Sequence, residues 1–67
     1  MNRVQVNGEL LEIPRGWRLS DLLLDLGHAG RRVAVDRNGQ IVPRSAHDTT
    51  PLQDQDRIEI VAAVGGG

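Results

Sequence analysis

The sequence has no cysteine, phenylalanine, tyrosine or lysine among its 67 residues. Without cysteine, disulfide bonds, thiolate catalysis and cysteine-ligated zinc are all excluded. Without lysine, the chain offers no side-chain amine for isopeptide or Schiff-base chemistry. Trp17 is the only aromatic residue, so leucine, valine, isoleucine and alanine must form the core. A chain this short has room for one domain with a thin core, which Trp17 is expected to cover.

The sequence also lacks an excess of charge of one sign and a long apolar run. Eight basic and nine acidic residues leave a formal net charge of −1, which gives no polyelectrolyte attraction to nucleic acid or anionic lipid. The longest apolar run, 60–64, is far too short to cross a bilayer, and the N-terminus lacks the pattern of a secretory signal. We therefore expect a cytoplasmic protein that binds neither nucleic acid nor a membrane.

An asparagine-glycine pair at 7–8 predicts a tight turn near the start of the chain. Residues 3–6 alternate polar and apolar side chains before it, and Leu11 and Ile13 resume the alternation after it. This pattern is typical of a β-hairpin. Because Leu11 and Ile13 are placed toward the core, Leu10 is expected on the opposite face of the sheet.

Four leucines then recur at i, i+3, i+4 and i+7, the spacing of one face of an α-helix. They are Leu19, Leu22, Leu23 and Leu26. Leu24 is predicted to point away from this packed face. Arg18 or Ser20 would lie near the start of the helix, and Gly27 is suited to the left-handed residue that ends it.

A second asparagine-glycine pair, at 38–39, predicts a second hairpin between strands at 33–36 and 40–42. The polar stretch 44–50 is expected to be a surface loop with room for one helical turn. Residues 57–61 alternate polar and apolar side chains and predict a final strand.

In chain order these elements form an α+β pattern with one helix. One main helix packed on one face of a mixed sheet of four to five strands is the economical arrangement. By analogy this is a β-grasp, the ubiquitin-like topology, in which the first and last strands lie parallel at the centre. Residues 1–64 would form this domain, and 65–67 a flexible C-terminal glycine tail. The sheet residues predicted to face the helix are Val4, Val6, Leu11, Ile13, Val35, Ile58 and Ile60.

No arrangement of side chains predicts catalysis or metal binding. His28 and His47 lie in separate loops without a second ligand at metal-binding spacing, so both are interpreted as surface histidines. Asp54 and Asp56 flank one residue before the last strand, which is a common turn pattern. Ser20 has no general base beside it in the sequence. We therefore expect no catalytic residue, no metal and no cofactor in this chain.

The arginines form a second candidate feature. Arg31 and Arg32 are adjacent, while Arg37 and Arg44 flank the second hairpin. Together they could form a basic rim that faces an acidic partner, although a solvated surface of mixed charge is the commoner meaning of such a pattern.

The chain ends in Gly65, Gly66 and Gly67. Terminal glycines alone are most often a frayed tail, but these follow almost directly on the predicted last strand. A glycine segment can thread a narrow cleft, and it has no Cβ to block reagents at its carboxyl carbon. The Gly67 carboxylate is ionised at neutral pH and is a competent nucleophile toward the α-phosphate of ATP. It would need activation by another protein before it could accept sulfur.

Ordering such a tail in a partner costs about 1–2 kcal/mol per residue in backbone entropy. Exposed apolar side chains on the body of the domain would have to compensate for that cost. Our candidates for this partner surface are Leu10, Val61 and Ala63, which are predicted to face away from the helix.

Segments along the whole chain carry a family pattern. They are residues 7–9, the leucine-rich helix ending at Gly27, and residues 33–35, 38–44, 52–54, 57–61 and 64–67. Together they resemble the ThiS sulfur carriers of thiamine biosynthesis, most specifically at 41–44 and in the terminal glycines. Gln55 departs from the family's usual glycine in the turn before the last strand. Arg18 stands where a helix-capping threonine is common.

This resemblance implies a carrier protein rather than an enzyme. Gly66 and Gly67 match the family's terminal pair, and Gly67 would be adenylated by an E1-like enzyme of the ThiF type. The product would be a thiocarboxylate, with sulfur from a donor such as a cysteine desulfurase, and thiazole synthase of the ThiG type would receive that sulfur. Zinc or ATP would belong to the activating enzyme.

Other functions remain open at this point. The small subunit of molybdopterin synthase also resembles this fold and ends in Gly-Gly, but its members are usually longer and richer in aromatic residues. Other ubiquitin-like sulfur carriers supply sulfur to cysteine or to the thiolation of natural products. A different class would be a ubiquitin-like interaction domain with an inert tail, or a modifier attached to the lysines of other proteins.

Overall fold

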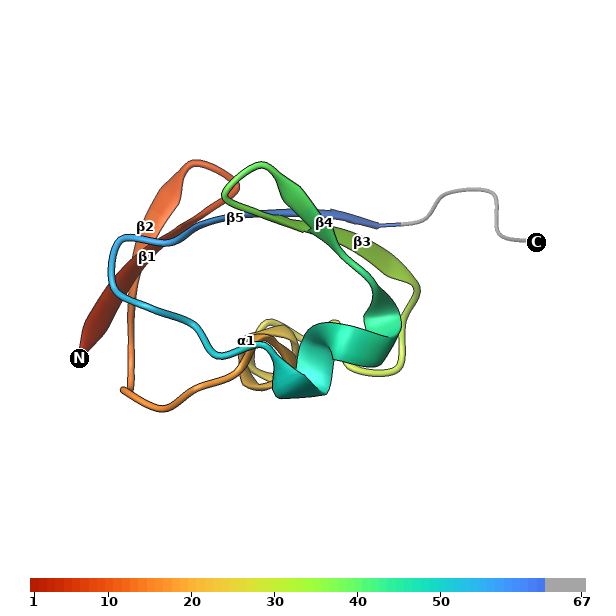
Figure 1. Ribbon diagram of the computed structural model, residues 1–67, viewed down its shortest axis with the longest axis horizontal. Coiled ribbons are helices and arrows are strands. Elements are labelled where there is room, and N and C mark those ends of the chain that lie inside the picture. The colour runs from red at the N-terminus through yellow and green to blue at the C-terminus, as the bar shows by residue number, and fades with distance from the viewer. Residues whose placement is uncertain (63–67) are drawn as a thin grey trace.

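A single sheet, with one α-helix on one of its faces, makes up the part of the chain that the computed structural model describes, residues 1–62 (Figure 1). The elements in chain order are β1 (Asn2–Val6), β2 (Glu9–Ile13), α1 (Leu19–Asp25), β3 (Val33–Arg37), β4 (Gln40–Val42), the 3₁₀-helix η1 (Arg44–Thr49) and β5 (Arg57–Ala62). Both helices lie on the same side of the sheet in Figure 1. Neither of these two helices is long and apolar enough to cross a membrane.

The strands are ordered β2-β1-β5-β3-β4. β1 and β5 are parallel, with Val6 opposite Ile58, whereas every other neighbouring pair is antiparallel. The first and last strands therefore lie side by side near the centre of a mixed five-stranded sheet. The predicted α+β fold, with its β-grasp arrangement, is confirmed. The predicted domain boundary between residues 64 and 65 lies outside the described residues.

Both asparagine-glycine pairs make the predicted hairpin turns. Asn7 and Gly8 have φ values of 49° and 86°, and Asn38 and Gly39 have values of 53° and 87°. Two consecutive positive φ values are characteristic of type I′ turns, whose twist matches that of the flanking strands. Asparagine and glycine tolerate this conformation best, which is why the pairs locate the turns so accurately.

The core lies between α1 and the covered face of the sheet. Its buried side chains are Val4, Val6, Ile13, Leu19, Leu22, Leu23, Val35, Leu52, Ile58 and Ile60. Six of the seven predicted inward residues are thus buried, and the seventh, Leu11, is partly buried because β2 is an edge strand. Trp17 packs partly buried against this core, as predicted.

The helix is one residue shorter than the leucine spacing predicts. Leu26 was expected on the packed face but is exposed, because α1 ends at Asp25 and Leu26 is its C-cap. Gly27 follows with a φ of 81° and ends the helix as predicted. Leu24 points away from the core and is 66% exposed.

The start of the helix compensates for a poor cap residue. Arg18 occupies the N-cap position, and its side chain has no acceptor atom to offer the free N–H groups of the first turn. Ser20 does not take over this role, since it lies inside the helix. Instead, Asp21 Oδ2 accepts a hydrogen bond of 2.8 Å from the backbone N–H of Arg18, and its charge complements the positive end of the helix.

The stretch 44–50 is more ordered than a surface loop. Residues Arg44–Thr49 form η1, and His47 in this helix is buried. Its Nε2 lies 3.0 Å from the carbonyl oxygen of Val42, at the end of β4. The interpretation of His47 as a surface histidine was therefore wrong. Val42 is partly buried, and this imidazole gives its carbonyl a hydrogen-bond partner.

A buried carboxylate fixes the turn before β5. Asp56 Oδ2 accepts hydrogen bonds from Arg37 Nε at 2.9 Å and from the N–H of Gln53 at 2.8 Å, while Oδ1 accepts one from Asn38 Nδ2 at 2.9 Å. Gln55 adopts the left-handed conformation, with a φ of 74°, a region of backbone conformation that favours glycine. The predicted turn is present, and Asp56 serves the fold.

These hydrogen bonds make stability depend on pH. Burial raises the pKa of Asp56, but the hydrogen bonds from Gln53, Asn38 and Arg37 outweigh burial and hold the pKa below its ordinary value. A group whose pKa is lowered by folding stabilises the protein above its unfolded pKa. That stabilisation is lost as the pH falls through the pKa of the folded state.

We expect Asp56→Asn to lower the free energy of unfolding by about 2–4 kcal/mol at neutral pH, because buried donors lose their charged acceptor. The difference from the wild-type protein should start to shrink below about pH 4, the ordinary pKa of the unfolded carboxyl, and should vanish once the pH falls below the lowered pKa of the folded state. Urea denaturation followed by Trp17 fluorescence measures both effects. Glu9→Gln, at an exposed position in β2, is the charge-matched control. An Asp56→Asn protein as stable as this control would contradict the prediction.

Candidate functional site

The residues predicted to react lie beyond the structured end of β5. Gly65, Gly66 and Gly67 are outside the described residues, as is Ala63 of the predicted partner surface. The last residue that the structure describes before them is Ala62, at the end of β5. Because β5 lies between β1 and β3, Ala62 ends an inner strand of the sheet and not an edge strand (Figure 1).

Asn7 holds the last part of β5 on its β1 side. The parallel pairing between β1 and β5 ends at Val6 and Ile58. Beyond that point, Asn7 Oδ1 accepts a hydrogen bond of 2.8 Å from the N–H of Ile60, and Asn7 Nδ2 donates one of 3.1 Å to the carbonyl of Ile60. On the other side, β3 pairs with β5 as far as Ala62. The C-terminal segment thus begins at a well-fixed point.

The open face of the sheet carries the predicted partner residues. Leu10 is 67% exposed and Val61 62% exposed, and both point away from α1 as predicted. Sequence reasoning missed Ile41, which is exposed on the same face in β4. These side chains lie on three different strands, so they are spread singly over the face, an ordinary pattern for a protein surface. Their role in binding a partner stays a prediction.

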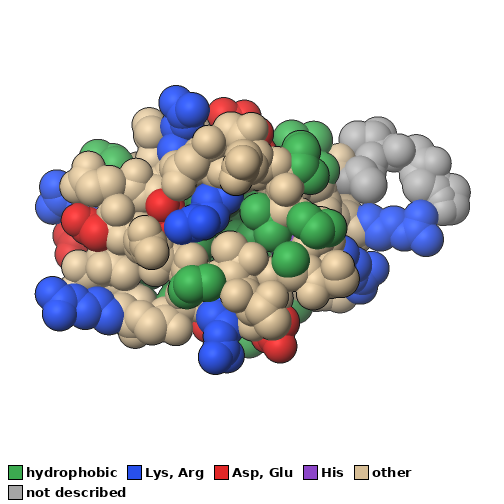
Figure 2. Space-filling view, viewed as in Figure 1, with side chains coloured by type: hydrophobic (Ala, Val, Ile, Leu, Met, Phe, Trp, Pro, Cys, Tyr) green, Lys and Arg blue, Asp and Glu red, His purple; other side chains and the backbone are tan. Residues whose placement is uncertain are grey.

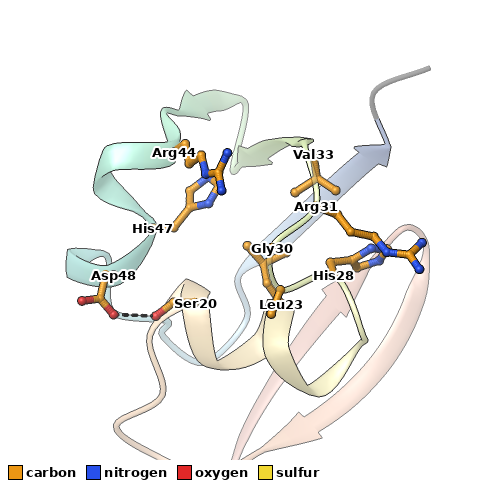
Figure 3. Close-up of a pocket in the computed structure, with 10 residues that line it drawn as sticks. Ser20, Leu23, His28, Gly30, Arg31, Val33, Arg44, His47 and Asp48 are labelled. Carbon is orange, nitrogen blue, oxygen red and sulfur yellow. Dashed lines mark hydrogen bonds between the residues drawn. The ribbon is translucent and has the colours of Figure 1, made fainter. Parts of the chain in front are cut away.

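A pocket of about 260 Å³ opens beside the end of β5 (Figure 3). Leu23 of α1 and Val33 of β3 form its apolar floor. His28 and Arg31, from the loop after α1, stand at one side, and Arg44 at the start of η1 stands at the other. Val33 is paired with Ala62 in the sheet, which places this pocket next to the point where β5 ends.

The pocket does not assemble a catalytic group. Ser20 lines it, but its hydroxyl donates a hydrogen bond of 3.0 Å to Asp48 Oδ1 and so ties α1 to η1. His47 lines it too and is engaged with the carbonyl of Val42. Within residues 1–62, no three histidine, aspartate or glutamate side chains are grouped as a metal site would require.

The structure separates the four arginines of the predicted basic rim. Arg37 lies at the far end of β3 and forms a salt bridge of 2.9 Å with Asp56. Arg31 and Arg44 stand on opposite sides of the pocket beside the end of β5, and Arg32 follows Arg31 directly before β3. Figure 2 shows exposed arginine side chains at that end of the molecule. Three of the four candidates thus share one surface, and Arg37 belongs to the fold instead.

Comparison with known proteins gives a single consistent family. The ThiS family model matches residues 4–67. Thiazole synthases from Magnetococcus marinus and Paramagnetospirillum magneticum are each 40% identical to this chain over 65 residues, which is 97% of this chain and 20% of theirs. The chain therefore spans about a fifth of the length of these curated relatives. An uncharacterised protein, ycf40 of Pyropia yezoensis, is 38% identical over 96% of this chain and 90% of its own length.

Solved structures give the same result. The crystal structure of the thiamine biosynthesis protein ThiS from Geobacter metallireducens is 31% identical and superimposes with a TM-score of 0.82, covering 97% of this chain and 99% of that one. An NMR structure of a thiamine biosynthesis protein from the same organism gives a TM-score of 0.77, over 97% of this chain and 87% of that one. The likeness therefore extends over nearly the whole chain.

Proposed function

This chain belongs to the ThiS family of sulfur carriers in thiamine biosynthesis, whose members are not enzymes themselves, and we propose that its reactive group is the α-carboxylate of Gly67. The proposal is supported above all by the family match, which runs through residue 67 and includes the terminal glycines. It is also supported by the fixed end of β5, because a rigid body can present a reactive end to a partner while docking beside the partner's active site.

The proposed reaction has two steps. A carboxylate oxygen of Gly67 attacks the α-phosphorus of ATP on an E1-like enzyme of the ThiF type, and pyrophosphate leaves. Sulfide, which a reducing thiol releases from the persulfide of a donor such as a cysteine desulfurase with formation of a disulfide, then attacks the carbonyl carbon and displaces AMP, which yields a thiocarboxylate. Glycine suits both steps because it has no Cβ to hinder the approach of either reagent to this carbon. All catalytic groups belong to the partners.

We propose thiazole synthase of the ThiG type as the protein that receives the sulfur. Two thiazole synthases contain a segment that is 40% identical to nearly the whole of this chain, and joining two proteins in one polypeptide raises their effective concentration for each other. The same observation favours thiamine biosynthesis over molybdopterin synthesis. Leu10, Val61 and Ala63 are proposed as part of the docking surface.

Intact-mass spectrometry tests the first proposal. After incubation with a ThiF-type enzyme, ATP and a sulfur source, we expect a mass gain that corresponds to the exchange of one oxygen for sulfur at the C-terminus. Omission of ATP is the control that should prevent the gain. An unchanged mass with an enzyme that loads a known carrier would contradict the proposal.

A pull-down tests the acceptor. The thiocarboxylate form is expected to copurify with thiazole synthase and to lose its sulfur when the substrates for thiazole formation are added. Copurification with a large molybdopterin synthase subunit, and none with thiazole synthase, would overturn the thiamine assignment while leaving the carrier chemistry in place.

A further inference from the structure

The fold brings three arginines to the end of the sheet from which the C-terminal segment continues. Val33 is paired with Ala62, so Arg31 and Arg32, which precede β3, lie beside the end of β5. Arg44 begins η1 and lines the same pocket as Arg31 and Val33. The loop before β3 and the start of η1, which are distant in sequence, therefore both place arginines near the end of β5.

Among residues 1–62, none of these three arginines takes part in a salt bridge. The side chains of Arg31, Arg32 and Arg44 are exposed. Arg37–Asp56 is the one salt bridge among residues 1–62. Asp48, whose carboxylate lines the same pocket, accepts a hydrogen bond from the hydroxyl of Ser20. A chain with a formal net charge of −1 thus exposes three arginines near one end of the sheet, and at physiological ionic strength an exposed charge acts over about 8 Å.

The proposed reaction gives these arginines a task. For Gly67 to reach the ATP, the body of the domain must dock beside the active site of the activating enzyme, and exposed charges on the body act on that docking. Five residues follow Ala62, and fully extended they span about 17 Å. With the terminus at the ATP, the arginines therefore lie near the entrance of the channel and not at the phosphates.

We propose that Arg31, Arg32 and Arg44 form a basic docking rim that binds an acidic segment at the entrance of the activating enzyme's channel. This inference rests on the proposed function and adds the chemistry of the partner surface. Complementary charge at the rim of an interface chiefly raises the association rate, and the gain falls as ionic strength rises. The rim thus promotes docking, and it leaves the chemical step at Gly67 unchanged.

Charge reversal tests the rim. Arg31→Glu, Arg32→Glu and Arg44→Glu are each expected to raise the KM for the carrier about tenfold at low salt, with kcat unchanged. The effect should fall to less than about twofold at 0.5 M salt. The corresponding lysine variants keep the positive charge and should behave like the wild-type protein. Arg15→Glu is the matched control, because it makes the same charge change after β2, at the opposite end of the sheet from Ala62.

The outcomes separate this inference from the proposed function. Normal loading of the wild-type protein, together with unchanged KM values for the rim variants, would overturn the rim and leave the carrier chemistry standing. A shift that equals that of Arg15→Glu, or that does not depend on salt, would also overturn it. If the wild-type protein is not loaded at all, the proposed function fails. In that case, calorimetry measures the Kd of each rim variant for the activating enzyme, and this tests the rim independently of the loading reaction.

Discussion

Adding one alanine after Gly67 is expected to abolish thiocarboxylate formation while leaving the fold intact. The extension turns the reactive carboxylate into a peptide group, and it places the new carboxylate one residue further along the chain, beside a Cβ. Misplacing a reacting group by as little as 1 Å can cost about a hundredfold in rate, and one extended residue spans about 3.5 Å. We therefore expect no product in intact-mass spectra taken over the time in which the wild-type protein is fully converted.

Removing Gly67 should abolish loading for a related reason. The shortened chain still ends in two glycines, but its carboxylate falls about 3.5 Å short of the ATP. Both variants should unfold at the wild-type temperature, because the sheet and core contacts described above lie within residues 1–62.

Gly65→Ala is the matched control for both tail variants. It adds a methyl group to the tail but keeps the chain length and the two terminal glycines, and it is expected to be loaded. Normal loading of the extended protein would contradict the proposed mechanism.

Local sequence signals were sufficient to predict most of this fold. The asparagine-glycine pairs require positive φ values at two consecutive residues, which few other residues accept, so both hairpins could be located from the sequence. Leucine spacing likewise identified the buried face of α1. The end of the helix was less certain, because Leu26 continues the leucine pattern although Gly27 already turns the chain away.

Features that depend on contacts between distant segments could not be predicted. Asp56 belongs to an ordinary turn in the sequence, and its burial depends on Arg37 and Asn38, which come from another hairpin. His47 stands in a polar stretch with no periodicity, and only the end of β4 gives it a partner.

The arginines of the candidate site illustrate the same limit of local signals. The sequence placed four of them around the second hairpin, and only the register of β3 against β4 and β5 separates Arg37 from the other three. The reactive terminus, by contrast, stays a prediction from chemistry and family resemblance, because Gly65, Gly66 and Gly67 lie outside the described residues.

Leu22→Ala is expected to lower the free energy of unfolding by about 2–5 kcal/mol, because it leaves a cavity in a close-packed core. Leu22 is fully buried. At about 0.05–0.15 kcal/mol per residue, a domain of this size has a total stability of roughly 3–10 kcal/mol, so this single change removes a large part of it. Leu24→Ala, two residues further along the same helix and 66% exposed, should change stability by less than about 0.5 kcal/mol.

Urea denaturation followed by Trp17 fluorescence compares the two leucine variants, since Trp17 packs against the same core. Equal stability of the two proteins would mean that the leucine face of α1 does not hold the domain together.

Loading of Leu22→Ala separates the role of the body from that of the tail. At a temperature where this variant is still folded, it should be loaded at the wild-type rate, because the body positions the carrier and the reacting atoms are those of Gly67. As the temperature rises through its lower melting point, loading should fall together with the folded fraction, because an unfolded chain has no fixed end of β5 from which to present the terminus.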